Sequence, residues 1–266
     1  TQLILDLYGT PQCAYSLRDL SVSRSSISSI GDTGGDTSGA WVVQVRRVSD
    51  DDKKSFTANE VTDGTLEAWV GTGDGRVSIW YDQSSSANNA TQTVTDRQPL
   101  IVSSGSLTTE GGLPAMFPDG VDDWLNLDTA VTGDTSTFAT YRATIDASPI
   151  YRHLGGAAAT AAGRRSNGKY YLQTSAGTFQ PTPSHPNDQI AAHYQTIGTA
   201  QSVHANDVLI GSQTAASANT GNIGRIAIYA GQYPGGSVSE VIIYNTDQAA
   251  NRSAIFADMM EHYNIT

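Results

Sequence analysis

Cysteine is nearly absent from this sequence, and its scarcity limits the chemistry that the chain can perform. The one cysteine among 266 residues, Cys13, cannot form an intrachain disulfide, and a zinc site built from several thiolates is excluded. We expect Cys13 to be a small buried apolar residue. The five histidines lack the HxH and HExxH spacings of zinc sites, so no zinc centre is predicted.

Long apolar runs and positive charge are also scarce. No stretch of about 18 apolar residues occurs, which excludes a transmembrane helix. The chain does not open with the basic and apolar segments of a signal peptide, although such a segment could have been removed. Charged residues make up 15% of the chain, and 15 Lys and Arg against 26 Asp and Glu give a net charge of −11. Because such a surface repels phosphate and anionic lipid, we expect neither a nucleic-acid partner nor membrane insertion.

Turn-forming residues are plentiful and separate short apolar runs. Gly accounts for 26 residues, and clusters of Gly, Ser, Asn and Pro recur without a fixed repeat. Short β-rich runs between such clusters are typical of an all-β fold, either a sandwich or a jelly roll. The runs occupy residues 41–47, 76–81, 115–117, 124–127, 169–172, 203–210, 223–229 and 237–244.

Two helices are predicted in addition to the strands. A short internal helix covers residues 65–70, and a C-terminal helix covers about residues 248–263. Residues 245–247 offer N-cap oxygens in front of the second helix. Its apolar side chains form one stripe at helical spacing, which we expect to pack on the sandwich: Ile255, Phe256, Met259, Met260 and Tyr263.

A series of landmarks beyond residue 80 carries a family resemblance. Residues 80–92 read WYDQSSSANNATQ, residues 119–125 read DGVDDWL, and residues 236–245 read GSVSEVIIYN. In this order the landmarks resemble the laminin-G-like branch of the concanavalin A-like lectin/glucanase superfamily, which implies a concanavalin A-like jelly-roll β-sandwich. We expect Trp80 and Tyr81 to supply core area and Asp82 to bond the turn that follows.

The first 80 residues carry a second resemblance. Residues 5–8 (LDLY), 14–18 (AYSLR), 45–47 (VRR) and 69–75 (WVGTGDG) look like the start of the arabinofuranosidase-B-type catalytic domain, which is built on the same jelly roll. The resemblance also extends to structural and fibre proteins of tailed bacteriophages. We therefore expect one domain over residues 1–266, in which residues 1–79 are an N-terminal extension packed on a laminin-G-like core of residues 80–266.

The catalytic carboxylates that this resemblance implies are missing from the matching segments. The family's nucleophile is a Glu in a mid-chain strand, and residues 168–177 contain no carboxylate. Its general acid is an Asp before the last core strand, and residues 225–236, aligned on Glu240, contain neither Asp nor Glu. The family's vicinal cysteine pair is absent as well. Asp122 and Asp123 are neighbours, so in a strand they would face opposite sides and could not share one substrate. We therefore expect that the chain is not an enzyme.

Sugar binding is the function that the remaining residues favour. Sugar sites combine aromatic faces with polar side chains, and the middle of the chain supplies both on strands that commonly form the concave sheet of a jelly roll. Its basic side chains favour an acidic glycan. The predicted carbohydrate-binding residues are Tyr151, Arg152, His153, Arg164 and Tyr170.

Calcium is the one metal that the sequence leaves open, and no other cofactor is expected. Jelly rolls of this superfamily often hold calcium on loop oxygens, as the resemblance implies. No twelve-residue EF-hand pattern occurs. The loop carboxylates that offer such oxygens belong to Asp32, Asp36, Asp119 and Asp122.

These observations lead to one main prediction and two alternatives. The main prediction is a non-catalytic carbohydrate-binding module of a phage virion protein: a tail fibre, head fibre or decoration. It would lie on the particle surface, contact other virion proteins, engage host-surface glycan and form a homo-oligomer such as a trimer. The first alternative is a glycoside hydrolase of the arabinofuranosidase type, and the second is a purely structural capsid or tail decoration domain. Activity on aryl arabinofuranosides would favour the hydrolase, and glycan binding would separate the main prediction from the structural one.

Overall fold

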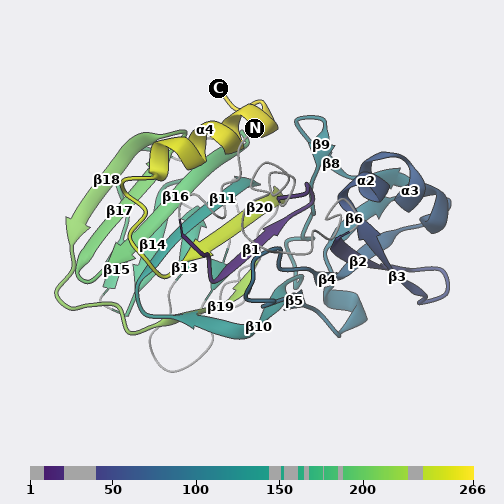
Figure 1. Ribbon diagram of the computed structural model, residues 1–266, viewed down its shortest axis with the longest axis horizontal. Helices are drawn as coiled ribbons and strands as arrows, with labels where there is room; N and C mark the ends of the chain where they lie inside the picture. The colour runs from purple at the N-terminus through teal and green to yellow at the C-terminus, as the bar shows by residue number, and fades with distance from the viewer. Residues whose placement is uncertain are drawn as a thin grey trace, which may run out of the picture.

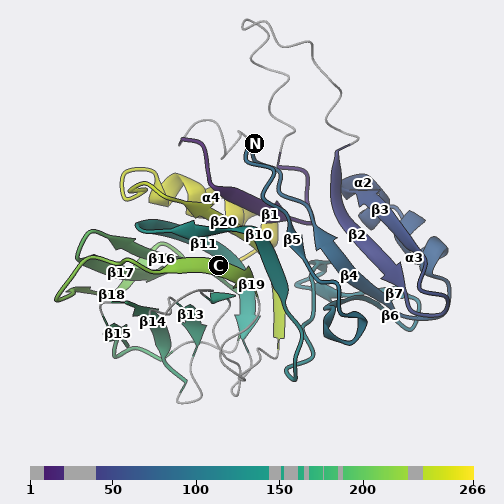
Figure 2. The ribbon, with the colours of Figure 1, turned by 90° about the horizontal axis from the view of Figure 1, so that it is seen from below.

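Antiparallel β-sheets make up most of the molecule, which confirms the predicted fold class. The computed structural model describes residues 9–20, 40–143, 151–152, 161–164, 168–175, 177–184, 188–226 and 236–266. In these residues two large sheets lie in layers, and helix α4 (Arg252–Tyr263) lies on the side of one sheet that faces away from the other (Figures 1 and 2). None of the described helices has the length and apolar character needed to cross a bilayer.

The first layer is a six-stranded sheet that joins both ends of the chain. The N-terminal strand β1 pairs with β20, the last strand, and each pairing in the sheet is antiparallel. In spatial order the strands are β1 (Cys13–Ser16), β20 (Gly236–Tyr244), β11 (Thr135–Ala143), β16 (Ile190–Ile197), β17 (Ala200–Ala205) and β18 (Val208–Thr214).

The second layer is a twelve-stranded sheet. Its main path runs through β15 (Gly177–Phe179), β14 (Tyr170–Thr174), β13 (Ala161–Arg164), β12 (Tyr151–Arg152), β19 (Asn222–Ile226), β10 (Leu125–Thr132), β5 (Ala90–Thr91), β4 (Gly75–Trp80), β2 (Trp41–Arg47) and β3 (Lys53–Thr57). Strand β6 (Leu100–Ser103) pairs with β4 and β7 (Ser106–Leu107). A separate hairpin consists of β8 (Thr109–Glu110) and β9 (Leu113–Pro114).

One face of the twelve-stranded sheet forms the main core. Five residues stand opposite one another on adjacent strands, each at most 6% exposed: Phe56, Val43, Trp80, Ala90 and Leu127. They belong to one apolar cluster with Val241 and Ile243 of β20, so this face packs on the six-stranded sheet. Burying each large side chain contributes about 1.5–3 kcal/mol.

Trp80, Tyr81 and Asp82, which begin the first landmark, do not all lie in the core. Trp80 is fully buried, as predicted. The prediction that Tyr81 also belongs to the core is wrong: Tyr81 follows Trp80 directly, so alternation turns it to the opposite face, where it is half-buried. Asp82 bonds the turn as expected, because its Oδ1 accepts the backbone N–H of Ser84 at 2.9 Å. The same oxygen accepts the N–H of Ala14 at 2.7 Å, which ties the turn to β1.

Two short helices cover the core at the end of the molecule where β2 and β3 lie (Figure 1). Helix α3 (Thr65–Val70) has the predicted bounds. Helix α2 (Ala58–Thr62) was not predicted, although Thr57 and Glu60 form a capping box at its start. Val61, Leu66 and Val70 join the main core cluster, so both helices pack on the inner face of the sheet.

Helix α4 closes a second, smaller core. Its buried side chains Ile255, Phe256 and Met259 pack against Phe138 and Ile242 of the six-stranded sheet. The helix begins at Arg252, four residues later than predicted. Asp247 does not cap it, because its Oδ1 accepts the N–H of Ala249 at 2.8 Å and an N–H of Gln195 at 2.8 Å.

One predicted run, residues 203–210, is two strands joined by a tight turn. Asn206 and Asp207 have φ values of 47° and 61°. Positive φ at both central residues is the geometry of a two-residue hairpin turn, and Asn and Asp tolerate it better than most residues. The chain therefore reverses between β17 and β18 instead of continuing as one strand.

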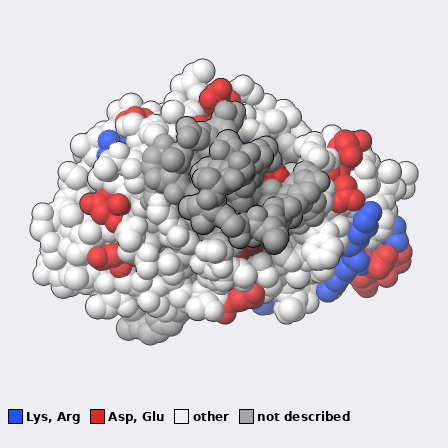
Figure 3. Space-filling model, viewed as in Figure 1, with Lys and Arg blue, Asp and Glu red and all other residues white. Residues whose placement is uncertain are grey.

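The basic side chains of β2 are neutralised by the loop that follows. Arg46 Nη1 lies 2.7 Å from Asp51 Oδ1, and Arg47 Nη2 lies 2.7 Å from Asp50 Oδ2. On the face shown in Figure 3, most of the visible Lys and Arg atoms lie at this end of the molecule, beside Asp and Glu. The described residues on the rest of that face are mostly uncharged, in keeping with the composition.

A buried ion pair fastens β1 to the rest of the fold. The Glu240 carboxylate on β20 is fully buried and accepts from Arg18 Nε at 2.7 Å, Ser16 Oγ at 2.9 Å and the Tyr263 hydroxyl at 3.1 Å. Arg18 also lies 2.6 Å from Asp258 of α4. These contacts hold β1, β20 and α4 together.

Replacing Arg18 with Met tests this fastening. The substitution keeps the apolar stem and leaves the Glu240 charge buried without its counter-ion, so we expect a loss of about 3–5 kcal/mol in the free energy of unfolding in urea. Arg252→Met is the control, since the pair of Arg252 with Asp207 at 3.3 Å is partly exposed and its loss should stay below about 1 kcal/mol. Similar losses for both variants would contradict the role given to Arg18.

Candidate functional site

The other face of the twelve-stranded sheet carries a row of mostly polar side chains. Six half-buried residues stand opposite one another on successive strands: Ser55, Gln44, Ile79, Thr91, Asn126 and Arg225. The same register continues through Arg152 and Ala161 to Gln173. We call this set the outer row. It presents hydroxyl, amide and guanidinium groups on the face opposite the core.

A fixed aromatic side chain lies beside the middle of the outer row. Trp124 Nε1 donates to Asn126 Oδ1 at 3.2 Å, and Arg225 Nε donates to the same oxygen at 2.9 Å. The guanidinium carbons of Arg97 and Arg225 lie 4.6 Å and 4.9 Å from the centre of the Trp124 ring. These cation–π contacts hold aromatic, cationic and amide groups in one place.

Three carboxylates gather directly before Trp124, in a segment that we call the acidic turn (residues 119–123). Asp119, Asp122 and Asp123 each place one carboxylate oxygen within 4.8 Å of the other two. The prediction that Asp122 and Asp123 face opposite sides is wrong, because this segment bends instead of forming a strand. The bend is held by Asp119 Oδ1, which accepts the N–H groups of Val121 at 2.8 Å and Asp122 at 3.1 Å.

Asp123 is the buried member of the acidic turn. Its side chain has no solvent exposure, and its Oδ2 accepts the N–H of Asp119 at 2.9 Å. Burial raises the pKa of Asp123 from an ordinary value of 3.8 to about 7, and the charges of Asp119 and Asp122 act in the same direction. This carboxyl group therefore holds its proton into the neutral range, as a general acid requires.

A polar cavity of about 440 Å³ lies beside Arg76, which connects it to the acidic turn. Arg46 and Arg76 stand opposite each other on β2 and β4, and Arg76 Nη1 lies 3.7 Å from Asp123 Oδ2. The volume falls within the range of small-ligand sites, about 300–1,000 Å³. The lining residues are Arg46, Val48, Asp51, Arg76, Thr95 and Asp96.

The structure connects the predicted sugar-binding strands to the outer row. Tyr151 and Arg152 form β12, Arg164 ends β13, and Tyr170 begins β14 opposite Arg164. Arg152 occupies the outer-row position beside Arg225. Tyr170 is 2% exposed and belongs to the main core cluster, and burial raises its pKa to about 12. His153 lies outside the described residues.

Two of the four predicted calcium ligands belong to the acidic turn. Asp119 and Asp122 meet Asp123 there, while Asp32 and Asp36 lie outside the described residues. Calcium takes six to eight oxygen ligands. Arg97 Nε lies 3.3 Å from Asp122 and already supplies positive charge. A calcium ion at the acidic turn stays a prediction.

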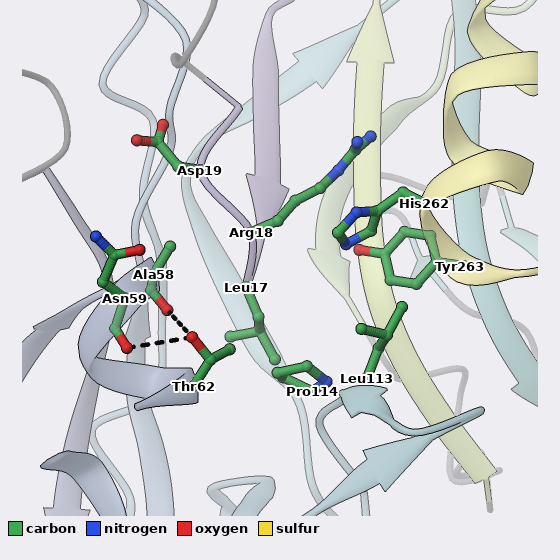
Figure 4. Close-up of a pocket in the computed structure, with 10 residues that line it drawn as sticks. All are labelled: Leu17, Arg18, Asp19, Ala58, Asn59, Thr62, Leu113, Pro114, His262 and Tyr263. Carbon is green, nitrogen blue, oxygen red and sulfur yellow. Dashed lines mark hydrogen bonds between the residues drawn. The ribbon is translucent and has the colours of Figure 1, made fainter. Parts of the chain in front are cut away.

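A second cavity, of about 230 Å³, lies between β1, α2, β9 and the end of α4. Figure 4 shows Arg18 extending toward His262 and Tyr263, while Asp19 points away from them. The guanidinium of Arg18 is engaged by Glu240 and Asp258. Burial lowers the pKa of His262 and raises that of Tyr263. Because its charged groups already serve the contact between β1, β20 and α4, this cavity is a weaker candidate than the outer row.

Comparisons with known proteins extend this picture. No family model and no curated protein matches the sequence. A GH54 α-L-arabinofuranosidase soaked with a cyclic sulfate inhibitor matches the fold with a TM-score of 0.67 and 13% identity. A mutant of such an enzyme soaked with 4-nitrophenyl α-L-arabinofuranoside gives 0.66 and 14%, and an arabinofuranosidase complexed with arabinofuranosyl-α-1,2-xylobiose gives 0.65 and 14%. Each match covers 93% of this chain and 62% of the other.

These matches place the chain in the fold class of arabinofuranosidases, and they correct the prediction that it is not an enzyme. The chain spans 62% of the length of those proteins, and at 13–14% identity the likeness shows the fold. Less than a tenth of this chain lies outside the first of these matches, so that match includes most of the first 80 residues. The prediction relied on carboxylates missing from two segments, whereas the acidic turn gathers three carboxylates elsewhere.

Replacing Asp123 with Asn tests the state of this carboxyl group. Between about pH 4 and pH 7 the folded protein holds a proton that the unfolded chain has released, so Asp123 weakens the fold as pH rises through this window. We expect the stability of Asp123→Asn relative to the unmodified protein to increase from pH 5 to pH 8 in urea unfolding. Asp128→Asn, at an exposed position on β10, is the control and should show no such trend. If the difference in the free energy of unfolding between Asp123→Asn and the unmodified protein does not vary with pH, the raised pKa of Asp123 is contradicted.

Proposed function

We propose that this protein is a glycoside hydrolase of the arabinofuranosidase type, with its substrate bound on the outer row beside the acidic turn. The observation that carries the proposal is the fold match over 93% of the chain to three arabinofuranosidase structures with sugars or an inhibitor. The chain spans 62% of those proteins, so activity and substrate are both part of the proposal.

The acidic turn supports the chemistry of glycoside cleavage. Retaining glycosidases use two carboxyl groups about 5–5.5 Å apart, one of them protonated. Oxygens of Asp122 and Asp123 lie within 4.8 Å of each other, and the pKa of Asp123 is raised to about 7. In the proposal Asp123 donates its proton to the leaving oxygen as the glycosidic bond breaks, and the Asp122 carboxylate, held by Arg97, bonds to the anomeric carbon. Water then attacks that carbon, gives a proton back to Asp123 and releases the sugar from Asp122. Because Asp123 has no solvent exposure, the proposal requires that groups covering it move aside when a sugar binds.

The surroundings of the turn support sugar recognition. Sugar hydroxyls form hydrogen bonds with amide, guanidinium and carboxylate groups, and aromatic rings pack against their C–H faces. Asn126, Arg225 and Trp124 supply these groups on one side of the turn. The 440 Å³ cavity beside Arg76 supplies space.

The finer predictions about biological setting stay predictions. They are a place on a phage virion, host-surface glycan, contacts with other virion proteins, and a homo-oligomer such as a trimer. The preference for an acidic glycan also stays a prediction, since the Arg152 and Arg164 side chains lie outside the described part of the chain.

Hydrolysis of 4-nitrophenyl α-L-arabinofuranoside tests the proposal directly. We expect release of 4-nitrophenol above the uncatalysed rate, and a fall in kcat as pH rises above about 7, where Asp123 loses its proton. Asp123→Asn should lower kcat by about 10²–10⁴-fold, because it removes the proton donor. Asp128→Asn is the matched control and should keep the full rate.

Two results would contradict the proposal. One is a rate no higher than that of buffer across pH 4 to 8. The other is hydrolysis that Asp123→Asn and Asp122→Asn leave at the level of Asp128→Asn, which would move the reaction away from the acidic turn.

A further inference from the structure

An aromatic pair with one exposed ring lies near the outer row and has no part in the chemistry proposed above. Trp41, the first residue of β2, is 59% exposed, and it is the one aromatic side chain in the described residues that is largely exposed. Its ring centre lies 6.1 Å from that of Tyr81, with 36° between the ring planes. The exposed ring of Trp41 is therefore available for stacking against a ligand.

The pair is held in position by the outer row itself. The Tyr81 hydroxyl and Ser55 Oγ lie within hydrogen-bond distance at 2.8 Å, and Ser55 is the first residue of the outer row. The backbone N–H of Tyr81 donates to the carbonyl of Val42, the neighbour of Trp41, at 3.0 Å. Gln44, also in the outer row, follows three residues later on the same strand. The aromatic surface is therefore continuous with a line of hydroxyl and amide groups.

The distance from the pair to the polar cavity favours a chain-like ligand. Trp41 lies five residues from Arg46, which lines the cavity. At about 3.3 Å per residue of strand, this separation is about 16 Å. A single sugar cannot reach from one to the other, whereas an oligosaccharide lying along β2 can.

The size of the aromatic surface argues against a protein partner. Two aromatic side chains offer about 150–250 Å² each, and one of these is half-buried. A stable protein interface buries about 1,200–2,000 Å² in total. Stacking against a sugar ring, with hydroxyl and amide groups beside it, needs no larger area.

We propose that Trp41 and Tyr81 form a remote subsite that stacks against a sugar ring of an oligosaccharide whose other end occupies the cavity beside Arg76. This inference rests on the proposed function in taking a glycan as the ligand. It goes further in assigning a preference for chains over single sugars, and in locating the residues that produce that preference.

Tryptophan fluorescence provides a direct test of occupancy. Of the four tryptophans, Trp80 and Trp124 are 0% and 8% exposed and Trp69 is half-buried, so Trp41 dominates quenching by iodide. Binding of a long arabinofuranosyl-xylo-oligosaccharide should protect Trp41 from iodide, and arabinofuranosyl-xylobiose should not. Trp41→Phe should remove both the quenching and the protection while keeping a ring for stacking.

Affinity measurements on variants test the chain-length preference. We expect the unmodified protein to bind the long oligosaccharide about tenfold more tightly than the short one, and Trp41→Ala to lose this gain. Trp41→Phe should keep most of it. Val208→Ala, which truncates an exposed apolar residue on β18, is the control and should keep all of it. Cleavage of 4-nitrophenyl α-L-arabinofuranoside should be the same in all four proteins.

The outcomes separate this inference from the proposed function. Three results would overturn the remote subsite. The tighter binding of the long oligosaccharide could survive in Trp41→Ala, or Trp41→Ala could lose the same affinity for short and long ligands. The long oligosaccharide could also fail to protect Trp41 from iodide. If the short glycoside is cleaved normally in that case, the proposed function stands alone. Binding of long chains that depends on Trp41, without any cleavage, would support the subsite and contradict the hydrolase.

Discussion

The strand register of the twelve-stranded sheet is the constraint on which the rest of the structure depends. Side chains alternate between faces, so a slip of one residue would expose Val43 and Trp80 and bury Gln44 and Asn126. The bulge on β4 matters in the same way. Gln44 pairs with Ile79 but Val45 pairs with Val77, so Ser78 is the extra residue. This shift keeps Val77 buried and sets Arg76 opposite Arg46, where both line the polar cavity.

Much of the fold could be predicted from local pattern, and the errors have local causes. The run WVVQVRR gives β2 with its observed bounds, and α3 also has the bounds predicted for it. The single run over residues 203–210 failed because apolar residues flank Asn206 and Asp207, whose turn chemistry was overlooked. Helix α4 starts late because Asp247 bonds backbone and side-chain groups before it. The order of strands in each sheet could not be predicted, since it depends on pairings between residues far apart in the chain.

The candidate site was harder to predict than the fold. The segment DGVDDWL drew attention to its carboxylates, but treating it as a strand separated Asp122 from Asp123. Only the bonds made by Asp119 reveal the bend that brings these carboxylates together. Arg225 meets Trp124 through the pairing of β19 with β10, and Arg97 meets it from a short 3-10 helix over residues 95–97. No local pattern shows either contact. We expected a non-catalytic chain because the carboxylates of one family's active site are missing from the matching segments. The structure places three carboxylates together elsewhere, in the acidic turn.

Side-chain amide NMR provides the most direct test of the claim that the outer row is the sugar-binding surface. Titration with an arabinofuranosyl-xylo-oligosaccharide should shift the side-chain amide signals of Gln44 and Asn126, and also that of Gln173 if the ligand extends to β14. Those of Gln189 and Gln248, which lie away from the outer row, should stay unchanged. A shift confined to the side-chain amide signal of Asn59, which lines the cavity beside Arg18, would contradict the account and move the site to the junction between β1 and α4.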